Sequence, residues 1–148
     1  MENIEIREID KNDYIEVALL WNNELGYDYV NEKNISVVFE KMNKDDNYKT
    51  FVAVLENKVI GFVTIVKILA LEYEIGYLKI NGIAVNKKYQ NLGIGTKLLK
   101  YVEKYSLKEN LSKIILTSRI KRTEAHVFYE HYGFDKESYC FTKKLNRD

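Results

Sequence analysis

Apolar and polar residues recur with two different periods along the chain, and these periods separate the expected strands from the expected helices. Residues 4–9 alternate apolar and charged side chains, which predicts a strand. From residue 15 to residue 21 apolar side chains recur at helical spacing, and this helix is expected to end near Gly26. Residues 35–42 repeat the helical spacing, so a second helix is expected there.

The middle of the chain has the pattern of consecutive strands. Residues 50–55 and 59–69 are rich in apolar and β-branched side chains, and a short polar turn lies between them. A third run of this kind covers residues 77–85. These segments predict a hairpin followed by a further strand.

The last third of the chain alternates helical and strand patterns. An amphipathic helix is expected over residues 96–108 and a short strand over residues 113–118. Another helix is expected over residues 123–132 and a final strand over residues 137–145. The whole order predicts an α/β protein, with an α+β mixed sheet and helices on its faces, built as a single domain over residues 1–148.

The charge, the cysteine count and the lack of long apolar runs limit the partners and the cellular compartment that we expect. A net charge of +1 with 30% charged residues gives no reason to expect nucleic acid or an anionic membrane as a partner. Cys140 is the one cysteine of the chain, so no intrachain disulfide can form. The sequence has neither a signal-peptide pattern nor an apolar run of about 18 residues. We therefore expect a cytoplasmic protein.

The segment from residue 85 to residue 96 joins a strand to a helix and contains two glycines, Gly93 and Gly95. Glycine lacks a Cβ atom, so the backbone here can approach a ligand closely. The amides at the start of the helix would meet a diphosphate at the positive end of the helix dipole. The sequence fits neither a Walker loop nor a Rossmann turn, which needs a small residue where Leu98 stands. Alternatively, the two glycines only shape a tight turn.

The run Gln90-Asn91-Leu92-Gly93-Ile94-Gly95 resembles the Gln/Arg-x-x-Gly-x-Gly/Ala signature of the GNAT N-acetyltransferase superfamily. In that family the loop binds the pyrophosphate of coenzyme A, and the preceding strand splays from its neighbour and pairs with the pantetheine amides. The resemblance implies a central, mostly antiparallel, splayed sheet and acetyl-CoA as the co-substrate. It also implies cofactor contacts from Ile83, Ala84, Val85, Gln90, Asn91, Leu92, Gly93, Ile94, Gly95 and Thr96.

The strand before this turn leaves two questions open. Gly82 suits either a β-bulge that frees one strand edge or a close packing contact. Some family members carry a glutamate base near the position of Lys79, so the expected carboxylate is missing here. Glu72, Glu74 or Asn81 could hold a water instead, or orientation alone could supply the rate.

The segment from Ala125 to Phe134 resembles the later helix of the family, which often reads Ala-x-x-Phe-Tyr-x-x-x-Gly-Phe. By this resemblance Tyr129 is the general acid that protonates the departing thiolate, since a phenol with a pKa near 10 is protonated at neutral pH. The alternative for Tyr129 is a packing role, which is also the role expected of Phe128 and Tyr132.

Arg122 stands where the family often has asparagine, and this variant resembles one found in small bacterial acetyltransferases. By its charge Arg122, with Arg119 and Lys121, could contact coenzyme A phosphates. His126 and His131 are five residues apart, a poor spacing for two ligands on one helix face, so no metal site is expected.

The resemblance therefore implies an N-acetyltransferase that carries an acetyl group from acetyl-CoA to a primary amine, by direct attack through a tetrahedral intermediate. A small-molecule amine is the leading acceptor. A protein or peptide N-acetyltransferase and a non-catalytic acyl-CoA sensor are the alternatives, and homodimers are common in the family. The acceptor region, which could also be a simple capping turn, is expected to include Trp21, Asn22, Glu24, Gly26, Tyr27, Asp28 and Tyr29.

Overall fold

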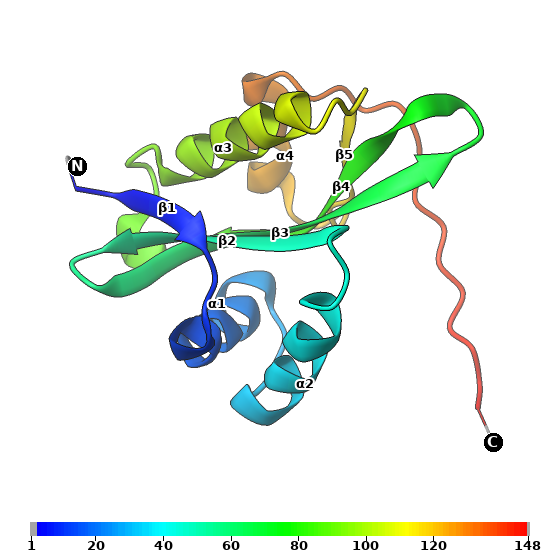
Figure 1. Cartoon of the computed structure of the whole chain (residues 1–148). Coiled ribbons are helices and arrows are strands. Elements are labelled where there is room, and N and C mark those ends of the chain that lie inside the picture. The colour runs from blue at the N-terminus through cyan, green and yellow to red at the C-terminus, as the bar shows by residue number, and fades with distance from the viewer. Residues whose placement is uncertain (1–2, 148) are drawn as a thin grey trace. The chain divides into compact units, whose positions relative to one another are not determined.

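An open five-stranded sheet forms the centre of the computed structural model, which describes residues 3–147 (Figure 1). Its strands lie in sequence order, each paired antiparallel with the next from β1 to β4, whereas β5 pairs parallel with β4. The predicted fold class, a mixed and mostly antiparallel sheet with helices, is confirmed. The strands are β1 (Glu5–Glu8), β2 (Tyr48–Leu55), β3 (Lys58–Ala70), β4 (Tyr73–Val85) and β5 (Ile114–Leu116).

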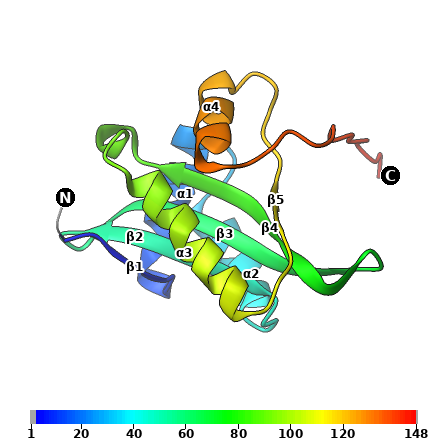
Figure 2. The same cartoon turned by 90° about the horizontal axis from the view of Figure 1, so that it is seen from above.

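The sheet belongs to the first of two compact units, Met1–Leu116 and Thr117–Asp148, which are described separately. In the first unit, helices α1 (Tyr14–Leu25) and α2 (Glu32–Met42) cover one face of the sheet. Helix α3 (Ile94–Lys108) lies across the opposite face, over β2, β3 and β4 (Figure 2). The second unit contains helix α4 (Thr123–Tyr132). Among residues 3–147, no helix has the length and apolar character needed to cross a membrane.

The face of α1 that packs on the sheet contains only some of the apolar residues of this helix. Ile15 and Leu19 belong to the apolar series that predicted this helix, yet their side chains are 50% and 54% exposed. Tyr14, Val17 and Ala18 are buried, and they share one face of the helix. The Tyr14 ring stacks on Phe39 of α2 with 4.8 Å between ring centroids, which joins the two helices over the sheet.

The limits of several strands also differ from the prediction. β4 begins at Tyr73 rather than at residue 77, and β5 is shorter than residues 113–118. The strand expected over residues 137–145 is wrong, because no strand forms over this part of the described chain. Tyr139 and Phe141 alternate as in a strand but are 87% and 90% exposed. Alternation alone does not make a strand, which also needs a hydrogen-bonded neighbour.

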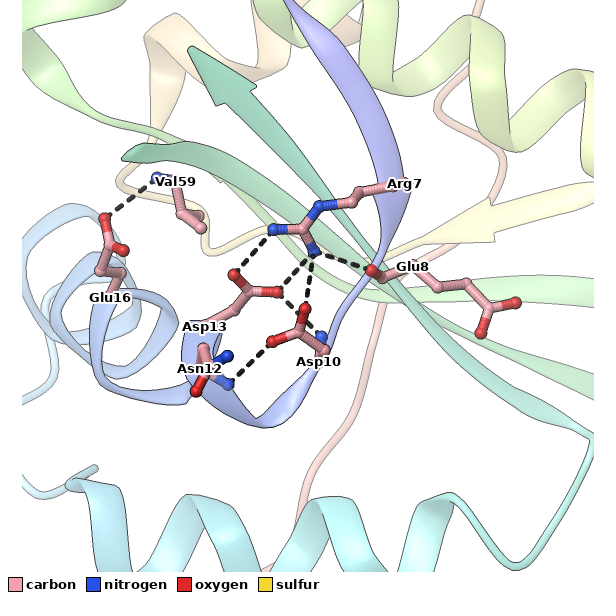
Figure 3. Close-up of polar contacts among 7 residues, drawn as sticks. All are labelled: Arg7, Glu8, Asp10, Asn12, Asp13, Glu16 and Val59. Atoms are coloured by element: carbon pink, nitrogen blue, oxygen red, sulfur yellow. Dashed lines mark hydrogen bonds and ion pairs between the residues drawn. The ribbon is translucent and has the colours of Figure 1, made fainter. Parts of the chain in front are cut away.

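A bidentate ion pair ties β1 to the start of α1 (Figure 3). The Arg7 guanidinium donates to the two Asp13 carboxylate oxygens at 2.7 and 3.0 Å. The backbone amide of Asp10 donates to Asp13 Oδ2 at 2.8 Å. Burial by itself would raise the pKa of Asp13, but the bonds from Arg7 and Asp10 and the Arg7 charge lower that pKa below its ordinary value.

Removing this ion pair is expected to destabilise the protein. We expect Arg7→Ala to lower the free energy of unfolding by about 2–3 kcal/mol, because it leaves the Asp13 charge buried and unpaired. Since the folded pKa of Asp13 lies below its unfolded value near 3.8, the pair stabilises fully above that pH and is lost as pH falls through the folded pKa. Urea titrations at pH 7 and pH 3 measure both effects.

Lys49 provides the control for this prediction. Its side chain pairs with Glu8 at 3.5 Å, but the Glu8 side chain is 62% exposed. Lys49→Ala is therefore expected to cost less than about 1 kcal/mol. Equal losses for the two alanine variants at pH 7 would contradict the assignment.

Candidate active site

The glycine turn between β4 and α3 has a left-handed backbone at two positions. The chain leaves β4 at Val85 and passes through a short 3₁₀ helix, η2 (Lys87–Tyr89). Asn91 then has φ of 65° and Gly93 has φ of 81°. Side chains other than those of glycine, asparagine and aspartate rarely adopt this region, so Gly93 is needed for the backbone to enter α3 in this way.

The first turn of α3 keeps its amide groups accessible to a partner. Gly93 is the N-cap residue and has no side chain to accept a hydrogen bond from the helix. The first intrahelical bond runs from the Lys97 amide to the Gly93 carbonyl, so the amides of Ile94, Gly95 and Thr96 precede the regular ladder. A Cβ atom built on Gly93 would meet nothing within 4 Å. An anion can therefore approach the positive end of the α3 dipole from this side.

Polar contacts hold the turn in place. The Asn86 amide donates to the Ile60 carbonyl of β3 at 2.7 Å, and its side chain accepts from the Lys88 amide at 3.0 Å. Gln90 Nε2 donates to the Val85 carbonyl at 3.0 Å. The Gln90 side chain therefore closes the turn on the end of β4. Sequence reasoning gave no role to the exposed cations here, which are Lys87, Lys88 and Lys97.

β4 and β5 separate just before the turn. Their parallel pairing ends at Ile80 and Leu116, so β5 leaves the rest of that β4 edge unpaired within the first unit. The register of β4 with β3 shifts at the same place, from Ile80 opposite Ile65 to Gly82 opposite Thr64. Asn81 is the extra residue of this bulge and is exposed. The predicted splay is therefore present, and its free edge leads directly into the glycine turn.

Gly82 also makes the close packing contact that was its alternative role. A Cβ atom on Gly82 would lie 2.5 Å from Trp21 Cζ3 and 3.0 Å from Cη2. The Trp21 ring stacks on Phe62 at 5.8 Å and on Tyr27 at 5.9 Å, and Tyr27 meets Tyr29 edge-on at 5.4 Å. Trp21 Nε1 is enclosed and has no hydrogen-bond partner among the residues that the structure describes. A series of aromatic rings therefore runs from the bulge to the loop after α1.

Gly82→Ala is expected to displace the Trp21 ring. The added methyl group cannot coexist with the ring at 2.5 Å, and overpacking of this kind costs about 1–3 kcal/mol. Trp21 is the one tryptophan of the chain, so its fluorescence emission reports the displacement directly. Gly61→Ala is the control, because the three atoms nearest to its Cβ atom, at 3.1 to 3.5 Å, belong to Ala84, Leu98 and Val85 and not to Trp21. An unchanged emission spectrum in Gly82→Ala would contradict the packing described.

In the second unit, the predicted acid Tyr129 lies on α4 and is 7% exposed. Its ring contacts Phe128 and Phe134, with centroids 5.5 and 5.9 Å away. Burial raises the pKa of Tyr129, and the charge and hydrogen bond of Arg122 offset this only in part. The phenol therefore stays protonated well above neutral pH.

The loop before α4 is held by hydrogen bonds to the Arg119 backbone. His126 Nε2 lies 2.8 Å from the Arg119 carbonyl, which also accepts from the Arg122 amide at 3.0 Å. Nothing among the described residues gathers three or more histidine, cysteine or acidic side chains as a metal site would require.

The sequence from residue 5 to residue 134 matches the family model described as the acetyltransferase (GNAT) family. The chain belongs to the GNAT acetyltransferase family. The match covers the splayed strand, the glycine turn and α4. No curated protein matches the sequence significantly.

Solved structures with a similar fold include other GNAT proteins. A GNAT family acetyltransferase from Staphylococcus aureus subsp. aureus USA300_TCH1516 is 25% identical, with a TM-score of 0.80 and coverage of 96% of this chain and 98% of that one. An aminoglycoside acetyltransferase from an uncultured soil metagenomic sample, solved with trehalose, is 21% identical, with a TM-score of 0.81 and coverage of 97% of each chain. A transcriptional regulator from Bacillus halodurans C-125 is 20% identical, with a TM-score of 0.89 and coverage of 97% of this chain and 100% of that one.

The residues that sequence reasoning assigned to the GNAT site fall into two groups. Residues 83–85 and 90–96 form one continuous strand edge and turn in the first unit. Arg122 and Tyr129 come together in the second unit, where Arg122 interacts with the phenol it was not expected to contact. Glu24 was expected in the acceptor region, but its carboxylate turns toward the glycine turn. No local sequence signal could have shown either contact.

Proposed function

We propose that this GNAT acetyltransferase transfers an acetyl group from acetyl-CoA to the primary amine of a small molecule. The observation that carries the acceptor class is the series of aromatic rings beside the β4 bulge. Acetyl-CoA, the co-substrate of the family, supplies the acetyl thioester when bound. The protein's own residues hold the two substrates, orient the amine and supply a proton.

The cofactor contacts follow from the glycine turn and the free edge of β4. The amides of residues 94–96, at the positive end of α3, bind the pyrophosphate, which Gly93 lets approach closely. Residues 83–85 offer backbone donors and acceptors to the amides of the pantetheine arm, as an added strand would require. Both features fit coenzyme A, because the amides of the turn match the charge of its pyrophosphate and the strand edge matches its extended pantetheine arm.

The acceptor lies along the aromatic rings that start at the bulge. Trp21, Tyr27 and Tyr29 offer apolar faces to the carbon skeleton and attract a cationic amine through their π-systems. Asp28, exposed in the same loop, adds negative charge. This surface suits a compact amine with an apolar body.

Two effects promote the reaction, which are the alignment of the amine with the thioester and general-acid catalysis by one side chain. The amine attacks the thioester directly, and holding the two reactants in line supplies much of the rate. Tyr129 donates its proton to the thiolate as it leaves, and the phenolate regains a proton through water from the nitrogen, which loses one as the amide forms. Burial raises the pKa of Tyr129, so the phenol is protonated when the thiolate leaves. Arg122 stays at the phenol and holds its orientation.

The test is thiol release from acetyl-CoA over a panel of amines. The panel contains polyamines, aminoglycosides, amino-acid amides and peptides with a free N-terminus or lysine. We expect the best small amine to have a kcat/KM at least about 10-fold above the best peptide, a difference of about 1.4 kcal/mol in transition-state binding. A peptide that reacts faster would make this a protein acetyltransferase, and acetyl-CoA binding without any release would make it a sensor.

A further inference from the structure

The Glu24 carboxylate in the last turn of α1 contacts the glycine turn, 63 and 66 residues further along the chain. Glu24 Oε2 accepts the Lys87 amide at 3.1 Å, and Oε1 accepts Gln90 Nε2 at 3.4 Å. Lys87 begins η2 and Gln90 immediately follows it. One carboxylate therefore holds both ends of the short helix that leads to Asn91 and Gly93.

The position of Glu24 is itself fixed by the core. α1 is anchored by Val17, Ala18 and Leu20, which are buried against the sheet. The helix is capped by Gly26, which has a left-handed backbone with φ of 79°. The Gly26 amide donates to the Asn22 carbonyl. The carboxylate thus links the turn to a rigid element, whereas the other bonds of the turn run to β3 and to the end of β4.

By Coulomb's law alone, the negative charge of Glu24 beside this turn would weaken the binding of an anionic cofactor. Two N–H groups are nevertheless directed at the Glu24 carboxylate, and hydrogen bonds to a charged acceptor are stronger than neutral ones. The geometry therefore favours a structural use of the carboxylate as an acceptor over a direct electrostatic role toward the cofactor.

We propose that Glu24 is a positioning residue for acetyl-CoA binding, which it supports by fixing η2 and Gln90 in the conformation that presents the α3 amides. This inference rests on the proposed role of the glycine turn in holding the pyrophosphate. Without Glu24, Gln90 keeps its bond to Val85, so the turn loosens but the fold persists. The loss appears in cofactor affinity and much less in the chemical step.

Glu16 is a matched control on the same helix. Its Oε2 accepts the Val59 amide at 3.0 Å, next to the hairpin between β2 and β3 (Figure 3). Like Glu24, it is a half-buried α1 glutamate that bonds to a distant backbone amide, but its bond ends on β3 instead of η2.

The experiment compares wild type, Glu24→Ala, Glu24→Gln and Glu16→Ala by calorimetric titration with acetyl-CoA, by steady-state kinetics and by thermal unfolding. We expect Glu24→Ala to raise the Kd and KM for acetyl-CoA about 10-fold, with kcat changed less than about 2-fold. Glu24→Gln keeps an oxygen for the Lys87 amide and should stay within about 3-fold of the wild-type Kd. Glu16→Ala should lower the unfolding temperature but leave the Kd unchanged.

Wild-type affinity in Glu24→Ala would overturn the inference, as would equal losses of affinity in the two alanine variants. If Glu24→Ala binds normally while a substitution of Gly93 abolishes binding, the positioning role fails and the cofactor turn stands. If the wild type itself does not bind acetyl-CoA, the proposed function fails together with this inference.

Discussion

Gly93→Val is expected to abolish measurable binding of acetyl-CoA, with a loss of at least about 100-fold, while the protein stays folded. Gly93 has φ of 81°, where a β-branched residue is strained, so the turn must shift to accept valine. The valine side chain would also fill the space in front of the α3 amides, where Cβ meets nothing within 4 Å. Calorimetric titration measures the loss, and circular dichroism checks the fold.

A pair of alanine variants separates this effect from backbone strain alone. Gly76 has the same φ of 81°, but its Cβ atom would lie 2.9 Å from the Ile68 carbonyl. Gly76→Ala is therefore expected to destabilise the protein more than Gly93→Ala, yet to bind acetyl-CoA normally when folded. Normal binding by Gly93→Val, or a larger binding loss in Gly76→Ala than in Gly93→Ala, would remove the turn as the pyrophosphate site.

Tyr129→Phe is expected to lower kcat by about 100-fold, within the usual contribution of a general acid, with little change in the affinity for acetyl-CoA. The substitution keeps the ring between Phe128 and Phe134 and removes only the hydroxyl group. Because burial raises the pKa of Tyr129 above its ordinary value, ionisation of this phenol should lower the wild-type kcat only at a more alkaline pH than that at which a free tyrosine ionises. Steady-state kinetics across pH measure both effects.

Tyr132→Phe provides the comparison on the same helix. Tyr132 is half-buried and its ring lies 6.0 Å from Phe134, so the substitution should leave kcat within about 2-fold of wild type. Full activity of Tyr129→Phe at neutral pH would show that the thiolate leaves without a proton from this phenol.

The parts of the site that are continuous in sequence could be predicted from it. The glycine turn is such a part, because Gly93 and the helix start lie within a few residues and backbone geometry links them. The splay of β4 came from the family resemblance, and Asn81 forms the bulge beside Gly82. Local conformation at these positions depends on glycine, on hydrogen-bonding geometry and on the helix dipole, which sequence reasoning can treat directly.

The contacts between distant segments could not be predicted. Trp21 lies against Gly82, and Glu24 bonds to Lys87, only because α1 crosses the sheet at one particular place. The buried face of α1 could not be predicted either, since Ile15 and Leu19 are as apolar as the residues that are buried. Tertiary packing determines which apolar face of a helix is buried, and the helical period alone does not determine it.

The expected strand over residues 137–145 failed for a different reason. Tyr139 and Phe141 have high β-propensity and the right alternation, but propensity is a weak guide when no neighbouring strand is paired. Arg122 has the charge to bind a phosphate, and its contact with the Tyr129 phenol is a further interaction that the sequence did not show.

Amide hydrogen exchange of the wild-type protein, with and without acetyl-CoA, tests the central claim most directly. The amides of residues 94–96 precede the regular ladder of α3, and β5 leaves the β4 edge beyond Ile80 unpaired, so both should exchange readily in the free protein. The account predicts that acetyl-CoA slows exchange in these two segments together. Unchanged exchange in both segments at a saturating concentration of acetyl-CoA would contradict it.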